Sequence, residues 1–233
     1  MIALTRRAFG TLALVTGSPT LVEPVLRLPP SNRPTVALTL DACPGAFDAR
    51  LARSLSDNAI PATIFVTSTW IRSNPTGLAF FLEHRTLFSL QNHGDHHRPA
   101  ILGTAPIYGL KPAGTLDAIR TEVMGGSKII ANEAGIVPKW YRGAAALYSP
   151  EVLPAIEQMG FAIGGFSLNA DAGASLPAVT TAARIAKARD RDVIIGHINQ
   201  PLRPSGAGIA AGVIALKNQG MVFAWLPSVS DNN

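Results

Sequence analysis

The sequence predicts one α/β domain, an incomplete (β/α) barrel of about seven units with parallel strands. Three observations favour this fold. Apolar segments of strand length alternate with helical patterns from residue 35 to the end of the chain. Most of these segments are continuously apolar, as expected for parallel strands that are buried on both faces. The chain has 233 residues, of which 47% are hydrophobic and 15% charged, enough for one domain with a large core. A doubly wound open sheet is the alternative architecture.

The elements follow from these patterns in chain order. Strands are expected at 35–40, 62–66, 87–91, 139–142, 161–166, 192–196 and 222–225. Helices are expected between them, at 48–58, 74–84, 115–133, 150–159, 178–189 and 207–219. The helix at 150–159 has the clearest start, because Ser149 is a good cap, Pro150 suits the first helical position and Glu151 adds an early acid. The Pro- and Gly-rich segment 98–114 is the longest expected loop and a candidate cleft wall.

Charge and cysteine content narrow the classes of function. The net charge is +5, from 20 Lys and Arg against 15 Asp and Glu. The basic residues are scattered, and no Lys/Arg run is interleaved with aromatic residues, so nucleic-acid binding is not expected. Cys43 is the only cysteine, which excludes an intramolecular disulfide.

Polar side chains directly follow several of the expected strands. They are Asp41, His93, Arg142, Asn169 with Asp171, and His197. In parallel α/β folds catalytic residues gather at the carboxyl ends of the strands, so these side chains are expected to meet. This agreement in position across separate strands is the main sign of an active site.

The segment His93-Gly94-Asp95-His96-His97 holds three of the five histidines. If it turns helically, His93 and His97 point the same way, as two ligands of one metal must. Pairing of His93 with His96 is the alternative, because positions three apart also converge. A purely structural role in a polar loop is the non-functional interpretation.

The other strand-end residues suit acid–base roles. Asp41 ends an apolar strand, where an unpaired carboxylate is costly, and is a candidate general base, metal ligand or turn residue. Arg142 could orient Asp41 or form an ordinary salt bridge. Asp171 could orient and polarise His197, a candidate general acid, or serve as a turn residue or helix cap. Together these residues predict a metal-assisted hydrolase.

Five motifs of this chain resemble, in order, those of the polysaccharide deacetylases of carbohydrate esterase family 4. The resemblance runs from about Val36 to Asn199. The family's first motif is a strand followed by two aspartates, a catalytic base and a metal ligand, and residues 38–45 (LTLDACPG) resemble it. The family's His-x-x-x-His metal motif matches His93 to His97.

The last three motifs complete the resemblance. The arginine motif matches residues 141–143 without the usual prolines, the acidic motif matches 169–171 without the usual tryptophan, and the final histidine motif matches 194–197. The resemblance implies hydrolytic removal of an N-acetyl group from an amino sugar of a glycan. In that reaction Asp41 would be the base, held by Arg142, and His197, supported by Asp171, would be the acid.

The first motif departs from the family at Ala42, where the metal-ligand aspartate is missing. The resemblance implies a divalent metal, zinc first with cobalt or nickel as alternatives, bound by His93, His97 and a carboxylate. Three protein ligands are usual at a catalytic zinc. Asp48 is the favoured replacement, because Gly45 gives the loop freedom to bring it back, and Asp95 and Asp41 are the alternatives.

Other functions remain open from the sequence. One is a non-catalytic glycan-binding module on the same barrel, with Ala42 marking the loss of the metal. Another is a deacylase that acts on an O-acyl or non-sugar substrate. A thiol nucleophile at Cys43 is a further hypothesis, but the sequence shows no group that would activate it.

The N-terminus predicts export. Thr5-Arg6-Arg7-Ala8-Phe9-Gly10 precedes a short apolar run and resembles a bacterial twin-arginine signal, although a frayed basic terminus is the alternative. The apolar run is too short to span a bilayer, so no stable membrane insertion is expected. We expect residues 1–28 to be the signal segment and lead-in, residues 29–233 to be the catalytic domain, and the protein to be periplasmic or secreted.

Overall fold

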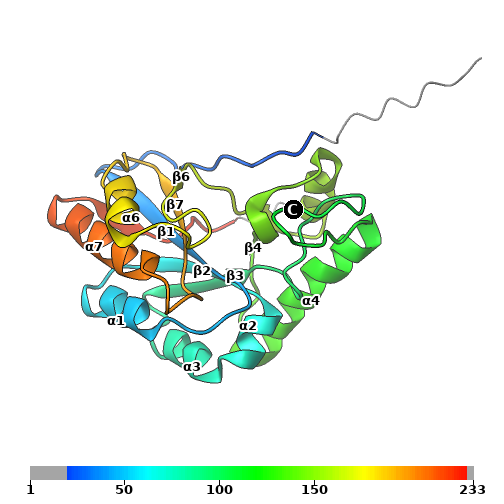
Figure 1. Ribbon diagram of the computed structural model, residues 1–233, viewed down its shortest axis with the longest axis horizontal. Coiled ribbons are helices and arrows are strands. Elements are labelled where there is room, and N and C mark those ends of the chain that lie inside the picture. The colour runs from blue at the N-terminus through cyan, green and yellow to red at the C-terminus, as the bar shows by residue number, and fades with distance from the viewer. Residues whose placement is uncertain (1–19, 230–233) are drawn as a thin grey trace, which may run out of the picture.

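Within residues 20–229, which the computed structural model describes, eight parallel strands form one curved sheet with helices on its outer side (Figure 1). The strands are β1 (Thr35–Ala42), β2 (Ala62–Val66), β3 (Phe88–Asn92), β4 (Trp140–Tyr141), β5 (Ala162–Ile163), β6 (Leu168–Asn169), β7 (Val193–His197) and β8 (Val222–Ala224). The helices are α1 (Ala49–Asp57), α2 (Ser68–Ser73), α3 (Pro75–Glu83), α4 (Leu116–Ala134), α5 (Leu153–Gln158), α6 (Ala178–Ile185) and α7 (Ser205–Asn218). Two 3₁₀ turns cover Ala144–Ala146 and Pro150–Val152.

The strand order is β5-β4-β3-β2-β1-β7-β6, and β8 pairs with the first residues of β1. Strand β1 is central: Leu40 lies opposite Ile64 of β2 on one side and opposite Gly196 of β7 on the other. The path of paired strands ends at β5 and at β6, so the barrel is open between them. This arrangement confirms the predicted incomplete (β/α) barrel with parallel strands.

An extended segment before β1, residues 22–28, lies along this opening. Phe166, in the connection from β5 to β6, donates its N–H to the carbonyl of Pro24 and accepts a hydrogen bond from Leu26. Leu28 donates to the carbonyl of Arg191 at the start of β7, and its side chain is buried. In Figure 1 this stretch is the dark blue trace along the upper edge of the molecule. Residues 22–28 are therefore packed against the barrel.

Strand alternation in β1 determines which side chains can reach the barrel interior. One side of β1 packs in the outer core, together with buried side chains of the helices. Its residues there are Val36, Leu38, Leu40 and Ala42. The residues between them face the other side, where Ala37 packs with Phe65 and Ile195. Asp41 shares this inner side at the carboxyl end of the strand, whereas the side chain of Ala42 packs in the outer core.

The expected elements differ from the observed ones mainly at the edges of the sheet. Helix α2 and strand β6 were not predicted, and the expected strand 161–166 is only the two-residue β5. The reason for the short β5 lies in Arg142, whose side chain donates to the carbonyls of Gly164 and Gly165. These two carbonyls accept hydrogen bonds from a side chain. In a longer strand they would accept them from the backbone of a neighbouring strand.

The twin-arginine motif, with Arg6 and Arg7, lies outside the described residues. Among residues 20–229, no helix combines the length and the apolar character that crossing a membrane requires.

Candidate active site

A cleft of about 880 Å³ lies at the carboxyl ends of the strands. The predicted residues that line it are Asp41, His93, His97 and His197, and they come from β1, the loop after β3, and β7. Arg142 and Asp171 are fully buried beneath them. The structure therefore brings together six of the seven residues predicted to act in catalysis or metal binding, all except Asp48, and Asn169 lines the same cleft.

Asp41 is held by Arg142 in a buried ion pair. The guanidinium Nη1 donates to Oδ1 of Asp41 at 2.7 Å, while Nη2 donates to the hydroxyl of Thr39 at 2.9 Å. Nε donates to the carbonyl of Gly164 and Nη2 also donates to that of Gly165, so the arginine is held in one orientation. The guanidinium also lies over the ring of Phe65, which neighbours Asp41 on β2. Arg142 therefore positions the carboxylate.

This pairing keeps Asp41 ionised. Burial alone would raise the pKa of the carboxyl group, but the charges of Arg142, His93 and His197 and the hydrogen bond from Arg142 lower it below its ordinary value of 3.8. A carboxylate in the cleft can accept a proton.

The two histidines converge without a helical turn. Residues 93–97 form an irregular loop in which Gly94 has a φ of 90° and His97 a φ of 60°. In this loop the rings of His93 and His97 lie 5.0 Å apart between centroids. The predicted partners are thus brought together, but the local helix expected there is absent. His96 is more than half exposed and lies 3.3 Å from the carboxylate of Asp95.

The orientation of His93 is set by its second nitrogen. Nδ1 lies 2.7 Å from the carbonyl of Arg142, which can only accept, so Nδ1 carries the proton. In the neutral ring, Nε2 then presents its lone pair to the cleft. His93 is 1% exposed, so the imidazole has little freedom to turn away. This arrangement is typical of histidines that bind metals.

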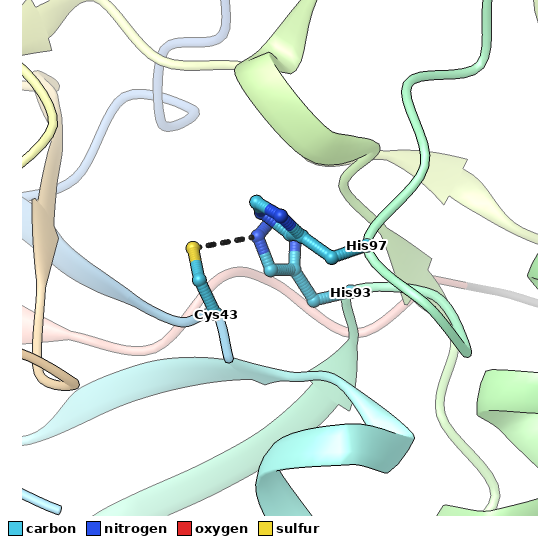
Figure 2. A group of neighbouring side chains, drawn as sticks. All are labelled: Cys43, His93 and His97. Carbon is cyan, nitrogen blue, oxygen red and sulfur yellow. Dashed lines mark hydrogen bonds between the residues drawn. The ribbon is translucent and has the colours of Figure 1, made fainter. Parts of the chain in front are cut away.

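Cys43 lies beside these histidines. Its Sγ is 3.4 Å from Nε2 of His93, and Figure 2 shows the thiol and both imidazoles grouped together. One donor atom each from Cys43, His93 and His97 lies within 4.8 Å of the others. Burial disfavours the thiolate, but the charge of His93 and hydrogen bonds with His197, His93 and His97 bring the pKa of Cys43 well below 9.0. One sulfur and two imidazole nitrogens fit a divalent cation of the zinc type.

Asp48, the favoured third ligand, has a different position. Its Oδ1 accepts hydrogen bonds from the backbone N–H groups of Arg50 and Leu51, at 3.2 and 3.1 Å. The carboxylate thus caps the N-terminus of α1, where an acceptor satisfies free N–H groups. Asp48 does not belong to the Cys43, His93 and His97 group. Its position directly before a helical pattern was the signal for a cap.

His197, which is partly buried, pairs with the fully buried Asp171. Nδ1 of His197 lies 2.9 Å from Oδ1 of Asp171. The other carboxylate oxygen, Oδ2, accepts a hydrogen bond from the backbone N–H of His197. Burial disfavours the charged ring, but the hydrogen bond and charge of Asp171, together with Cys43, raise the pKa of His197 well above 6.5. The raised pKa favours the charged ring, in which Nε2 is a donor.

Two further residues belong to the site, and sequence patterns did not single them out. Glu122 of α4 is buried, and its Oε1 accepts hydrogen bonds from the N–H groups of His96 and Arg98. It fixes the loop that carries the histidines. Glu23, from the segment along the barrel opening, lines the cleft. No local pattern signals either role, because both depend on contacts between distant segments.

The chain is similar to known proteins both in sequence and in fold. Residues 29–164 match the family model for polysaccharide deacetylases, whereas no curated protein matches the chain. Among solved structures, the Bc1960 peptidoglycan N-acetylglucosamine deacetylase is 21% identical, with a TM-score of 0.72 over 87% of this chain and 90% of that one. A family 4 acetyl xylan esterase from Clostridium thermocellum, in complex with a cobalt ion, is 24% identical, with a TM-score of 0.66 over 82% and 87% of the two chains.

A carbohydrate esterase family 4 pseudoenzyme from Bacillus anthracis is also similar. It is 18% identical, with a TM-score of 0.69 over 89% of this chain and 68% of that one. At these identities the structural matches establish a shared fold. The family model covers more than half of the chain. The chain therefore belongs to the polysaccharide deacetylase family.

Proposed function

We propose that this protein is a metal-dependent hydrolase that removes N-acetyl groups from the amino sugars of a glycan. One observation carries the proposal. A carboxylate held by an arginine, a group of metal-ligand side chains and a histidine paired with a buried aspartate all meet in one cleft. These are the parts that hydrolysis of an amide requires: a base, an electrophile site and an acid.

Asp41 acts as the base. It accepts a proton from the water molecule whose oxygen attacks the acetyl carbonyl carbon. Arg142 keeps the carboxylate ionised and directed into the cleft, with Oδ2 on the side of His93. The attack forms the new C–O bond and turns the carbonyl oxygen into an oxyanion.

His197 acts as the acid. When the C–N bond breaks, protonated His197 donates its Nε2 proton to the leaving nitrogen, so the products are acetate and a free amino sugar. Asp171 holds Nδ1–H and stabilises the charged ring until the proton is transferred.

His93 and His97 would hold a divalent ion, zinc first. When bound, such an ion supplies a Lewis acid that polarises the acetyl carbonyl and makes water a stronger nucleophile. The cobalt ion in the Clostridium thermocellum esterase supports a divalent metal in this fold.

The rim of the cleft suits a sugar substrate. Tyr108, at the tip of the turn between Ile107 and Leu110, lines the cleft and is 82% exposed. Its backbone has a φ of 48°, a conformation that costs a non-glycine residue about 1 kcal/mol. An exposed aromatic ring held at a cleft can stack on the apolar face of a sugar ring.

Acetate release tests the proposal. We expect acetate from N-acetylglucosamine oligomers, with a roughly 10²–10⁴-fold loss in Asp41→Asn and in His197→Ala. Asp117→Asn, which changes a carboxylate exposed on α4, is the matched control and should retain full activity. Activity retained in Asp41→Asn or His197→Ala would contradict the assigned roles. Faster release from O-acetylated xylan than from N-acetylated oligomers would reassign the substrate to an ester.

A non-catalytic glycan-binding protein is the second candidate. The lack of an aspartate at Ala42 and the likeness to a pseudoenzyme of the same fold favour it. Such a protein would bind N-acetylglucosamine oligomers in calorimetry while releasing no acetate after zinc is supplied.

For localisation we propose export by the twin-arginine route, on the basis of Arg6 and Arg7. Replacement of both arginines by lysine should keep the protein in the cytoplasmic fraction of a bacterial host. Export that continues unchanged would contradict this proposal.

A further inference from the structure

We propose that Cys43 is the third protein ligand of the metal, so that the site is Cys43, His93 and His97. This inference rests on the proposed function only in assuming that the cleft binds a divalent ion. A thiolate would then occupy the place of the aspartate that the chain lacks at Ala42.

The arrangement of donor atoms supports a single shared ion. At a tetrahedral zinc with Zn–S of about 2.3 Å and Zn–N of about 2.0 Å, a sulfur and a nitrogen ligand lie about 3.5 Å apart. The observed separation between Sγ of Cys43 and Nε2 of His93 is 3.4 Å. The donor atom of His97 lies within 4.8 Å of both. All three donors are thus in reach of one ion with only small side-chain movements.

The course of β1 explains why residue 43 supplies the ligand. The side chain of Ala42 packs among the outer core residues, away from the cleft. Alternation along an extended chain returns the next side chain to the side of Asp41. Both Asp41 and Cys43 line the cleft, whereas Asp48 is used as the cap of α1. Among the described residues, Cys43 forms a group with both histidines, whereas Asp48, Asp95 and Asp41, the replacements expected from the sequence, do not belong to that group.

The ligand set has chemical consequences. Three protein ligands that leave a fourth position open are the pattern of catalytic zinc sites. A thiolate favours zinc and cobalt over harder ions such as magnesium or manganese, which prefer oxygen ligands. A bound ion also holds the sulfur as a ligand, which removes it as a nucleophile. The site should therefore be selective for zinc. When the metal is removed, thiol reagents should inactivate the protein.

Cobalt spectroscopy tests the ligand directly. Metal-free full-length protein titrated with Co²⁺ should develop an intense near-ultraviolet band from thiolate-to-cobalt charge transfer, at one equivalent. Cys43→Ser should lose this band, and Cys43→Asp should bind cobalt without it. His96→Ala, which changes the exposed histidine of the same loop, is the matched control and should keep the band.

Zinc binding and thiol protection give independent measurements. Loss of a residue that only supports a ligand already costs about 10–100-fold in metal affinity, so Cys43→Ala should weaken zinc binding by more than 100-fold. Zinc should also slow alkylation of Cys43 by iodoacetamide. Zinc affinity unchanged in Cys43→Ala, or cobalt bound by the wild type without the charge-transfer band, would overturn the inference.

The outcomes separate this inference from the proposed function. Metal binding and acetate release without a thiolate band would leave the hydrolase and remove Cys43 from the site. Trapping of an acetylated Cys43 by mass spectrometry would overturn the ligand role and assign a thiol nucleophile. No binding of zinc or cobalt by the wild type would refute both proposals.

Discussion

Replacement of Arg142 by lysine tests how much the buried guanidinium fork contributes to stability. Lysine keeps a positive charge opposite Asp41, but one ammonium group cannot reproduce the geometry of the fork. The lost contacts are those of Nε with the carbonyl of Gly164, at 2.7 Å, and of Nη2 with the carbonyl of Gly165 and the hydroxyl of Thr39, at 3.1 and 2.9 Å.

The magnitude follows from the two carbonyls. Gly164 and Gly165 are buried, and a buried polar group left without a partner costs about 1–3 kcal/mol. Arg142→Lys should therefore lower the free energy of unfolding by about 2–6 kcal/mol. Since domains have a total of about 5–15 kcal/mol, the variant should fold but be clearly weakened. The lower limit corresponds to a fall in Tm of about 4–8 °C in a domain of this size.

Urea unfolding followed by circular dichroism is the assay. Chelator should be present for every variant, because a bound metal adds its own stabilisation to the folded state. Arg120→Lys, an exposed arginine on α4, is the control and should change the free energy by no more than about 0.5 kcal/mol. If Arg142→Lys loses less than about 1 kcal/mol, the hydrogen bonds of the fork do not hold the inner barrel together, and the reasoning is refuted.

Four further predictions concern the acid, the histidine loop, the barrel opening and the cleft rim. Because the charge of Asp171 raises the pKa of His197 and the acid acts when protonated, Asp171→Asn should move the alkaline limb of the pH–rate profile to lower pH, and an unmoved limb would contradict the pairing. Glu122→Ala should lower the free energy of unfolding by at least about 1.5 kcal/mol in urea, while Glu122→Gln keeps an acceptor and most of the stability. A chain that starts at residue 29 should melt below one that starts at residue 20, because burial of Leu28 alone contributes about 1.5–3 kcal/mol; equal melting temperatures would show that residues 20–28 add nothing. Tyr108→Ala should raise KM for N-acetylglucosamine oligomers with little change in kcat, Tyr108→Phe should restore it, and an unchanged KM for Tyr108→Ala would exclude stacking.

The strand-end pattern of the sequence was sufficient to assemble most of the candidate site. Asp41, His93 and His197 each lie at the carboxyl end of a strand, and parallel strands place such positions at one edge of the sheet. The positions of these residues depend on the periodicity and the direction of the strands, and short segments of the sequence encode both. The meeting of His93 with His97 was expected from a helical turn, whereas an irregular loop with positive φ at Gly94 and His97 produces it.

The proposed third metal ligand shows how different roles compete for the same local pattern. Asp48 has the right chemistry for a ligand, but an aspartate directly before a helix also satisfies free backbone N–H groups, and in the fold it does so. Cys43 could have been identified from strand alternation, because it is two residues after Asp41 and so shares its side of the chain.

Periodicity within short segments thus predicts the fold class, the central strands and the strand-end positions of the candidate acid–base residues. The other features depend on tertiary contacts. The edge strand β5 ends where Arg142 takes the carbonyls of Gly164 and Gly165, and residues 22–28 lie along the barrel opening through bonds to residues more than 100 positions away. Cys43 joins two histidines some 50 residues further along the chain. Such contacts depend on which segments the folded barrel brings side by side, and no local pattern encodes that.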